Sequence, residues 1–376
     1  MIGFFRPLQE RPQSSNGCKA FVDENFNFYR RTLAGAKEQL PRWRRCVRLA
    51  DRDLGEALGQ AYVDEAFPGD SKRNANELVR AVEQALERDI TGLDWMTAET
   101  KKEAARKLHA IEDKIGYPSQ WRDYSSVSIR RDSFLNNIHQ VTAFEFRRQL
   151  NKIGRPVDRA EWQMTPPTID AYYDAQLNTI NFPAGILQPP FFDKDNAAAA
   201  NFGAIGAVIG HEIIHGFDDE GRKFDAEGNL RDWWTPADGK AYDERGNCIA
   251  DQYTQEVPEA GVKQNGRLTQ GEDTADNGGV RLAFSALENQ LRKNGVSVDA
   301  KGADGWTPRQ VFFVSYADAW CTQMRPDVVR TMVLTNPHSH PRYRVNNVVS
   351  NLPEFQQAFG CKQGTPMVRK NACRVW

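Results

Sequence analysis

Two histidines four residues apart are the first residues in this sequence whose spacing points to chemistry. The run His211-Glu212-Ile213-Ile214-His215 places both imidazoles on one face of a helix, where they can share one Zn²⁺ ion. The chain has only 6 histidines in 376 residues, so the pair stands out from the composition. A catalytic zinc site also needs a third protein ligand and an open position, so the motif alone is incomplete.

An acidic segment downstream offers the third ligand. Glu272 and Asp276 lie one turn apart at the start of an apolar-periodic run that passes through Leu282 and Leu287 and stops at Gly295, which predicts a helix. We expect Glu272 to ligate the metal and Asp276 to accept the free ring N–H of a ligand histidine. Three small residues would let this helix approach the first one closely: Asn277, Gly278 and Gly279.

Glu212 follows a ligand histidine without being a ligand itself, and its place on the helix turns it toward the open side of the metal. Its expected role is general base toward a metal-activated water, followed by proton delivery to the leaving amine. Asp218, three residues after His215, is expected to hold the ring of that histidine as Asp276 holds the other.

The N-terminal part of the chain reads as a helical scaffold. Apolar residues recur every three or four positions in one amphipathic helix: Leu78, Val82, Leu86, Ile90 and Leu93. Thr97 is expected to N-cap a second, lysine-rich helix that runs to Ile115 and stops at Gly116.

A β-hairpin is predicted before the zinc motif. The segments Thr168–Tyr173 and Thr179–Phe182 are strand-like, and a polar turn around Asp174–Asn178 separates them. The edge of such a hairpin could pair with an extended peptide, main chain to main chain, although an ordinary structural hairpin would show the same pattern.

Composition excludes several classes of partner. Lys and Arg number 49 against 50 Asp and Glu, so the net charge of -1 favours neither nucleic acid nor an anionic membrane. No run approaches the ~20 apolar residues that a membrane-spanning helix needs. The six cysteines, taken by composition alone, favour reduced thiols in a core.

Beyond the zinc motif, the sequence resembles the neprilysin and endothelin-converting-enzyme family of zinc metallopeptidases, which are gluzincins with His-Glu-x-x-His and a distant Glu-x-x-x-Asp. The similarity extends from about Asn27 to Trp376, whereas residues before about Cys18 match nothing in the family. It rests on long shared strings: Trp43-Arg44-Arg45-Cys46, Gly55-Glu56-Ala57-Leu58-Gly59, Ile115-Gly116-Tyr117-Pro118, residues 182–192, Val208-Ile209-Gly210, Gly216-Phe217-Asp218-Asp219 and Cys373-Arg374-Val375-Trp376.

The resemblance implies a mainly α fold with a small β-sheet (α+β). A thermolysin-like zinc-peptidase catalytic domain would occupy residues 157–376, and residues 1–156 would form part of the helical covering domain and a linker, with 1–18 unassigned. The implied activity is a zinc endopeptidase, with one zinc per chain, that cleaves peptide substrates on the amino side of apolar residues.

Site residues follow from the same resemblance. His338 would stabilise the tetrahedral intermediate and Arg344 would bind a substrate carbonyl; aligning on Tyr343-Arg344 selects His338 rather than His340. Asp170 stands before Ala171 where the family usually has an asparagine that holds the substrate backbone. An ionised aspartate cannot donate a hydrogen bond, so substrate preference is expected to shift. Four residues match the lining of the family's apolar substrate pocket: Ile186, Phe191, Val208 and Trp320.

The resemblance reverses the interpretation of the cysteines. It implies a Cys248–Cys373 disulfide and an extracellular or periplasmic location, although this sequence shows no signal peptide or membrane anchor. Cys46, Cys321 and Cys361 match cysteines whose usual partners lie in an N-terminal half that this sequence does not contain. With the unmatched Cys18, they predict that the chain is the C-terminal half of a longer protein, with the other half as a possible partner.

Two other hypotheses about the function of the chain remain. The chain could be a catalytically impaired fragment that binds zinc but lacks the half needed to close the active-site cavity. It could also be an aminopeptidase on a related gluzincin scaffold, which would need an acidic amine-binding motif upstream of the zinc helix; Asp170 is the one candidate for that part.

Overall fold

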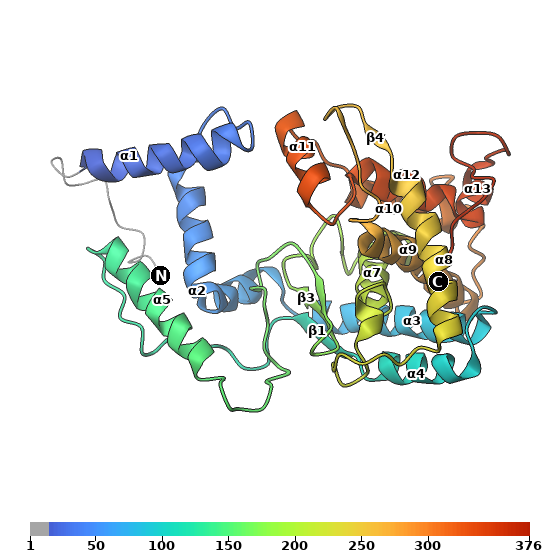
Figure 1. Cartoon of the computed structure of the whole chain (residues 1–376), viewed down its shortest axis with the longest axis horizontal. Helices are drawn as coiled ribbons and strands as arrows, with labels where there is room; N and C mark the ends of the chain where they lie inside the picture. Colours follow the sequence, from blue (N-terminus) through green and yellow to red (C-terminus); the bar gives the residue numbers. More distant parts are fainter. Residues whose placement is uncertain (1–14) are drawn as a thin grey trace. The chain divides into compact units, whose positions relative to one another are not determined.

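The computed structural model describes residues 15–376, and helices dominate them (Figure 1). Of the unassigned residues 1–18, positions 1–14 and the side chain of Cys18 lie outside the described part. The chain forms two compact units. Unit 1 contains the described residues up to Pro68 together with Gly116–Thr168, and unit 2 contains Gly69–Ile115 and Ile169–Trp376.

Unit 1 is helical. Its elements are α1 (Ser15–Asn25), η1 (Phe26–Thr32), α2 (Arg42–Ala66) and α5 (Phe134–Leu150). Gly55 in α2 allows a close approach to the segment before residue 168, because a Cβ there would lie 2.1 Å from Thr165 Cγ2. Many large apolar side chains of this unit are exposed, among them Phe21, Trp43, Leu135, Phe146 and Ile153.

Unit 2 contains the other described helices and the described strands, except for Gly116 at the end of the first strand. Its helices are α3 (Ser71–Gly92), α4 (Ala98–His109), α6 (Ala198–Asn201), η2 (Phe202–Gly206), α7 (Ala207–His215), η3 (Gly221–Lys223), α8 (Pro236–Tyr253), α9 (Gln270–Lys293), α10 (Pro308–Ala319), α11 (Pro326–Thr335), α12 (Pro341–Ser350) and α13 (Pro353–Phe359). Its strands are β1 (Glu112–Gly116), β2 (Tyr172–Asp174), β3 (Thr179–Pro183), β4 (Glu256–Val257) and β5 (Val262–Lys263).

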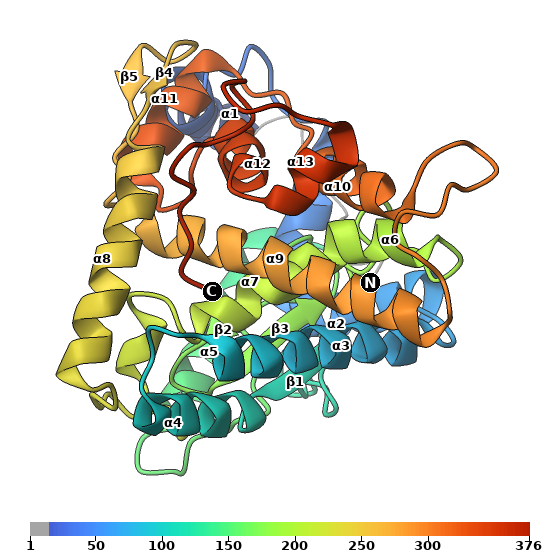
Figure 2. The same ribbon diagram turned by 90° about the vertical axis from the view of Figure 1, so that its right-hand side faces the viewer.

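Helix α9 is the centre of unit 2, where it packs against α7, α3, α8 and α12 (Figure 2). Helices make up most of the described residues and the strands are short, which confirms the predicted α+β class with little sheet. The predicted helix after Glu272 is present as α9, and Gly295 follows its end with a φ of 70°. A left-handed backbone of this kind favours glycine.

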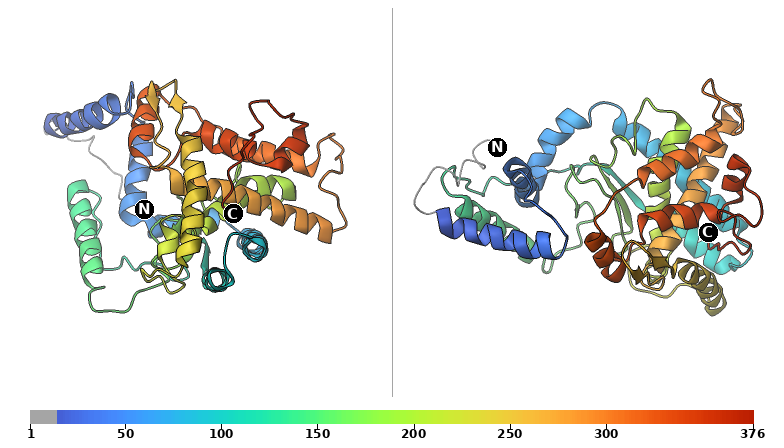
Figure 3. Two further views of the ribbon diagram at one scale, coloured as in Figure 1. Left: turned by 45° about the vertical axis from the view of Figure 1, so that its right-hand side comes forward. Right: turned by 90° about the horizontal axis from the view of Figure 1, so that it is seen from above.

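Helix α3 agrees with its predicted apolar period, because Leu78, Val82, Leu86 and Ile90 are all buried. α3 and α4 lie side by side, and the left view of Figure 3 shows them end-on. The apolar face of α3 packs on α9, so residues 69–115 belong to unit 2 and not with the other N-terminal helices.

The extent of the lysine-rich helix was predicted wrongly. Thr97 does cap α4 by accepting a hydrogen bond from the Thr100 N–H, but the helix ends at His109 and residues 112–116 form β1. The reason is a distant partner: β1 pairs with β3, and the Glu112 N–H donates to the Asn178 carbonyl at 3.1 Å. Pairing with a strand far along the chain overrode the local helical pattern.

The predicted hairpin is present in the main sheet, whose strand order is β1-β3-β2. β2 and β3 pair antiparallel with Tyr172 opposite Asn181 and Asp174 opposite Thr179. The first strand begins at Tyr172, four residues later than predicted. β2 is the last strand in this order and lies at one edge of the sheet.

A disulfide joins Cys248 in α8 to Cys373, with 5.6 Å between the Cα atoms, which confirms the predicted pairing. Cys46, Cys321 and Cys361 are free thiols. Within residues 15–376, no helix is long and apolar enough to cross a membrane.

Candidate active site

The site is built on two helices whose backbones nearly touch. α7 carries His211 and His215 one turn apart, and α9 begins with the turn that carries Glu272. Glycines at the contact make the approach possible, because a Cβ on Gly210 would lie 2.4 Å from the Gly279 carbonyl oxygen. A Cβ on Gly279 would likewise lie 2.4 Å from the His211 nitrogen.

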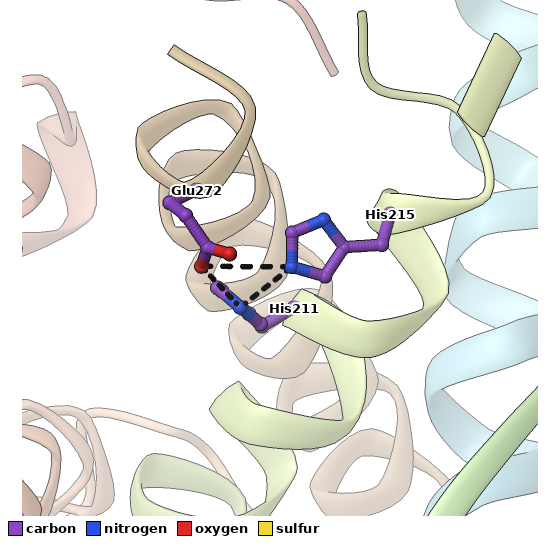
Figure 4. Close-up of side chains that lie close together, drawn as sticks. All are labelled: His211, His215 and Glu272. Atoms are coloured by element: carbon purple, nitrogen blue, oxygen red, sulfur yellow. Dashed lines mark hydrogen bonds and ion pairs between the residues drawn. The ribbon is translucent and has the colours of Figure 1, made fainter. Parts of the chain in front are cut away.

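Three side chains converge where these helices meet (Figure 4). The two Nε2 atoms of His211 and His215 are 2.9 Å apart, and Glu272 Oε2 lies 3.2 Å from the first and 3.6 Å from the second. Ligand atoms of a tetrahedral zinc with bonds of about 2.0–2.2 Å lie about 3.3 Å apart, so these separations suit one zinc ion.

The hydrogen bonds behind the two rings fix what their inner nitrogens can do. His211 Nδ1 lies 2.8 Å from Asp276 Oδ1, and His215 Nδ1 lies 2.6 Å from Asp218 Oδ2. Each carboxylate favours a proton on the Nδ1 that faces it, so each ring in its neutral form presents the lone pair of Nε2.

Glu272 Oε2 is a buried oxygen whose polar neighbours are ring nitrogens: Nε2 of His211 at 3.2 Å, of His215 at 3.6 Å and of His338 at 3.2 Å. Two ring nitrogens and a carboxylate oxygen therefore point their lone pairs at one another, an arrangement that a cation between them would satisfy. The donor set of two imidazoles and one carboxylate is typical of catalytic zinc, which keeps a further position open.

Glu212 lies between the two histidines in sequence and is 5% exposed. Burial raises the pKa of its carboxyl group, and His211 and His215 oppose this effect only when their rings are protonated. A carboxylate with a raised pKa is better suited to accept a proton near neutral pH. The negative charges of Glu272 and Asp170 raise the same pKa further.

Arg344 has a partner that the sequence analysis did not foresee. Its Nε and Nη2 donate to the two oxygens of Asp276 at 2.6 and 2.7 Å, and its guanidinium carbon lies 3.9 Å from the ring centroid of Trp320. Arg344 and Asp276 are 68 residues apart, so no local pattern could signal the pair. The guanidinium also lies near the three candidate metal ligands His211, His215 and Glu272, here called the ligand cluster. Its Nη2 is 3.8 Å from Glu272 Oε2.

The structure separates the two histidines before α12. His338 Nε2 lies 3.2 Å from Glu272 Oε2, whereas His340 Nε2 lies 3.3 Å from Glu259 Oε1. His338 is therefore the one beside the ligand cluster. A hydrogen bond at the next residue stabilises its loop, because Gln264 Nε2 donates to the buried Ser339 hydroxyl at 2.7 Å. The sequence alone did not predict this contact.

The predicted substrate-binding residues differ in how the structure places them. Asp170 is exposed before β2, and its carboxylate accepts the Ala171 N–H at 3.0 Å. Val208 is partly exposed one turn before Glu212 on α7. Ile186 is buried and Phe191 partly exposed after β3, and a part for them in a substrate pocket stays a prediction.

Fold and site together define a metallopeptidase-type centre, with paired helix histidines, a carboxylate from a second helix and a buried glutamate. Two family models described as peptidase family M13 match residues 170–375 and 13–118, and the chain belongs to this family.

Individual relatives agree. Endothelin-converting enzyme 1 of Homo sapiens is 38% identical over 97% of this chain and 48% of its own length. Neprilysin-2 of Drosophila melanogaster is 39% identical over 95% of the chain and 49% of its own length. The chain thus spans about half the length of these relatives.

Among solved structures, the zinc metalloprotease Zmp1 of Mycobacterium tuberculosis, in complex with an inhibitor, superposes with a TM-score of 0.90 at 40% identity, over 95% of this chain and 55% of that one. PepO of Lactobacillus rhamnosis gives a TM-score of 0.84 at 34% identity, over 92% of this chain and 53% of that one.

Proposed function

We propose that the chain is a zinc-dependent endopeptidase that hydrolyses peptide bonds on the amino side of apolar residues. His211, His215 and Glu272 would hold one zinc ion, and Glu212 would be the general base. The observation that carries the proposal is the convergence of three lone-pair atoms within 4.8 Å of one another beside a buried glutamate.

A zinc ion held here would act as a Lewis acid that lowers the pKa of water to about 7. Glu212 accepts a proton from the attacking water and delivers it to the leaving amine. His338 donates a hydrogen bond to the oxyanion that develops on the substrate, and Arg344 binds a substrate carbonyl. Asp276 and Asp218 keep the two ligand rings in the required tautomer.

Substrate recognition uses the hairpin and the apolar residues. An extended peptide would pair with the edge strand β2, next to Asp170 and Ala171. The apolar side chain after the cleaved bond would contact Ile186, Phe191, Val208 and Trp320, as the family resemblance implies.

The test combines metal analysis with substitutions of the site residues. The purified chain should contain about one zinc, and His211→Ala or His215→Ala should each abolish stoichiometric zinc. Glu212→Gln should retain zinc and fold while losing at least about 100-fold in hydrolysis, because an amide cannot accept the proton. Glu244→Gln, on the exposed face of α8, is the matched control. Loss of zinc in Glu212→Gln would assign Glu212 a structural role instead.

A second candidate is a zinc-binding half that hydrolyses peptides weakly because its cavity is incomplete. Three observations favour it. The chain spans about half of the relatives' length, large apolar side chains of unit 1 are exposed, and Cys46, Cys321 and Cys361 are free thiols. The polypeptide that corresponds to the relatives' other half would then be its partner.

One substrate series separates these candidates. Full activity on short N-terminally blocked peptides, with a sharp upper limit on substrate size, would support the endopeptidase alone. Weak activity without a size limit would support the incomplete half. Cleavage of only unblocked peptides would indicate an aminopeptidase.

An extracellular or periplasmic location belongs to the same proposal. It is supported by the Cys248–Cys373 disulfide, since disulfides persist in oxidising compartments.

A further inference from the structure

Lys107, on α4, is a lysine in an unusual place. Its side chain is 1% exposed, although lysine is almost never fully buried unless it is paired. Its Nζ donates to three main-chain carbonyls: Gly216 O at 2.6 Å, Gly221 O at 2.7 Å and Phe224 O at 2.7 Å. Three acceptors require three N–H donors, and only the protonated ammonium has three.

Aromatic rings complete the surroundings of this ammonium. Nζ lies 5.7 Å from the ring centroid of Tyr173, 5.6 Å from that of Phe217 and 6.0 Å from that of Trp233. Such contacts favour a cation. Burial lowers the pKa of Lys107 to about 7, and the charges of Asp218 and Asp225 oppose this effect.

The carbonyls that Lys107 binds belong to one loop. Gly216 directly follows His215, and Gly221 returns so close to that histidine that a Cβ would lie 1.7 Å from the His215 carbonyl oxygen. Lys107 therefore ties the two ends of the segment 216–221 to each other and to α4.

Asp218 sits in the middle of this loop and depends on its shape. Its Oδ1 accepts the N–H groups of Glu220 at 2.9 Å and Gly221 at 2.7 Å, while its Oδ2 faces His215 Nδ1 at 2.6 Å. If the loop ends separated, the amides that orient the Asp218 carboxylate would move, and the His215 ring would lose its fixed partner.

We propose that Lys107 is a positioning residue for the metal site: it clamps the loop 216–221, and through Asp218 it sets the orientation of the His215 ring. The effect passes from α4 to the zinc motif without any contact between Lys107 and the ligand atoms. This inference rests on the proposed zinc site for its effect on metal affinity, but its effect on the loop does not require a metal.

The test uses Lys107→Met, which keeps the length of the side chain and removes all three donors. Lys102→Met, on the exposed side of α4, is the matched control. Zinc affinity, measured by competition with a chelator, should fall about 10- to 100-fold in Lys107→Met, the size typical of losing a group that orients a ligand, and should not change in the control.

A double-mutant cycle distinguishes positioning from general support of the fold. If Lys107 acts through Asp218, the variant Lys107→Met/Asp218→Ala should bind zinc about as weakly as Asp218→Ala alone. Losses that simply add, or an unchanged affinity in Lys107→Met, would overturn the proposal. If Lys107→Met does not fold, Lys107→Gln, which retains part of the donor set, serves in the same cycle.

A metal-free measurement keeps the two proposals separable. The Gly221 amide donates to Asp218, so its hydrogen exchange in the zinc-free chain should be faster in Lys107→Met than in wild type, and unchanged in Lys102→Met. Equal exchange rates would refute the clamp. If the wild-type chain binds no zinc, but its Gly221 amide still exchanges more slowly than that of Lys107→Met, the proposed metal site is refuted. The role of Lys107 in holding the loop is then retained.

Discussion

The two candidate ligand histidines are held in place by different constructions. Behind His211 stands Asp276, one turn after Glu272 on the central helix α9, and this carboxylate is paired in two places with the buried Arg344. Behind His215 stands Asp218, on a short loop, and main-chain amides of the same loop hold it. One ring is oriented by a charge pair between helices, and the other by the conformation of a loop.

The difference shows which forces each half of the site depends on. The residues Asp276 and Arg344 are 3% and 5% exposed, so each charge would be costly to leave without the other. Asp218 is also buried, but its partners are neutral amides and a ring. The first support should fail when a charge is removed, and the second when the backbone is displaced.

The largest predicted difference is in stability. Asp276→Ala leaves the Arg344 charge buried without its partner and should cost about 3–5 kcal/mol of the free energy of unfolding. Asp218→Ala leaves two amides and a ring nitrogen unpaired and should cost about 1–3 kcal/mol. Both should weaken zinc binding about 10- to 100-fold. Urea unfolding of the metal-free variants and chelator competition measure the two effects.

The outcome bears directly on the comparison. Equal stability losses would mean that the Arg344 pair contributes no more than the loop, and the two supports would then be equivalent. An unchanged zinc affinity in either variant would remove that carboxylate from the site.

Glycine substitutions test how strongly each histidine's position depends on close backbone contacts. In Gly221→Ala the new Cβ would meet the His215 carbonyl, and in Gly279→Ala it would meet the His211 nitrogen. Each should destabilise the fold by about 1–3 kcal/mol, the usual cost of overpacking. Gly279→Ala forces α7 and α9 apart, so it should weaken zinc binding more than Gly221→Ala, which displaces only the loop.

Gly92→Ala is the control for this pair, because nothing lies within 4 Å of a Cβ at the end of α3. It should be neutral or slightly stabilising, since alanine favours helix over glycine. A stabilising effect in Gly279→Ala would show that the helices can separate without cost and that their close contact does not determine the site.

The sequence revealed those parts of the site that lie close together along the chain. His211 and His215, His215 and Asp218, and Glu272 and Asp276 are each three or four residues apart, so helix and turn geometry predicts which face they share. The choice of His338 over His340 came from a family resemblance, and the structure places His338 beside Glu272.

The parts that escaped prediction depend on residues far apart in the chain. Arg344 meets Asp276 across 68 residues, and Lys107 meets Gly216 across 109. The end of α4 was misplaced for the same reason, because pairing of β1 with β3 decided it. The sequence around a buried lysine or arginine does not show which distant residue it will contact. Its position in the helix looks like that of any other polar residue.

The smallest predicted effect concerns Asp170, which belongs to neither support. It is exposed, and its carboxylate accepts the adjacent Ala171 amide and no group of the ligand cluster. Asp170→Asn should therefore leave zinc affinity and stability unchanged. It should lower KM for a peptide about 2- to 10-fold, because an amide can donate to a substrate carbonyl and a hydrogen bond of this kind contributes about 0.5–1.5 kcal/mol. Steady-state kinetics on one blocked peptide, with zinc affinity measured in parallel, decide the matter. A fall in zinc affinity would mean that Asp170 supports the metal site as a third construction beside the two compared above, and an unchanged KM would remove it from substrate binding.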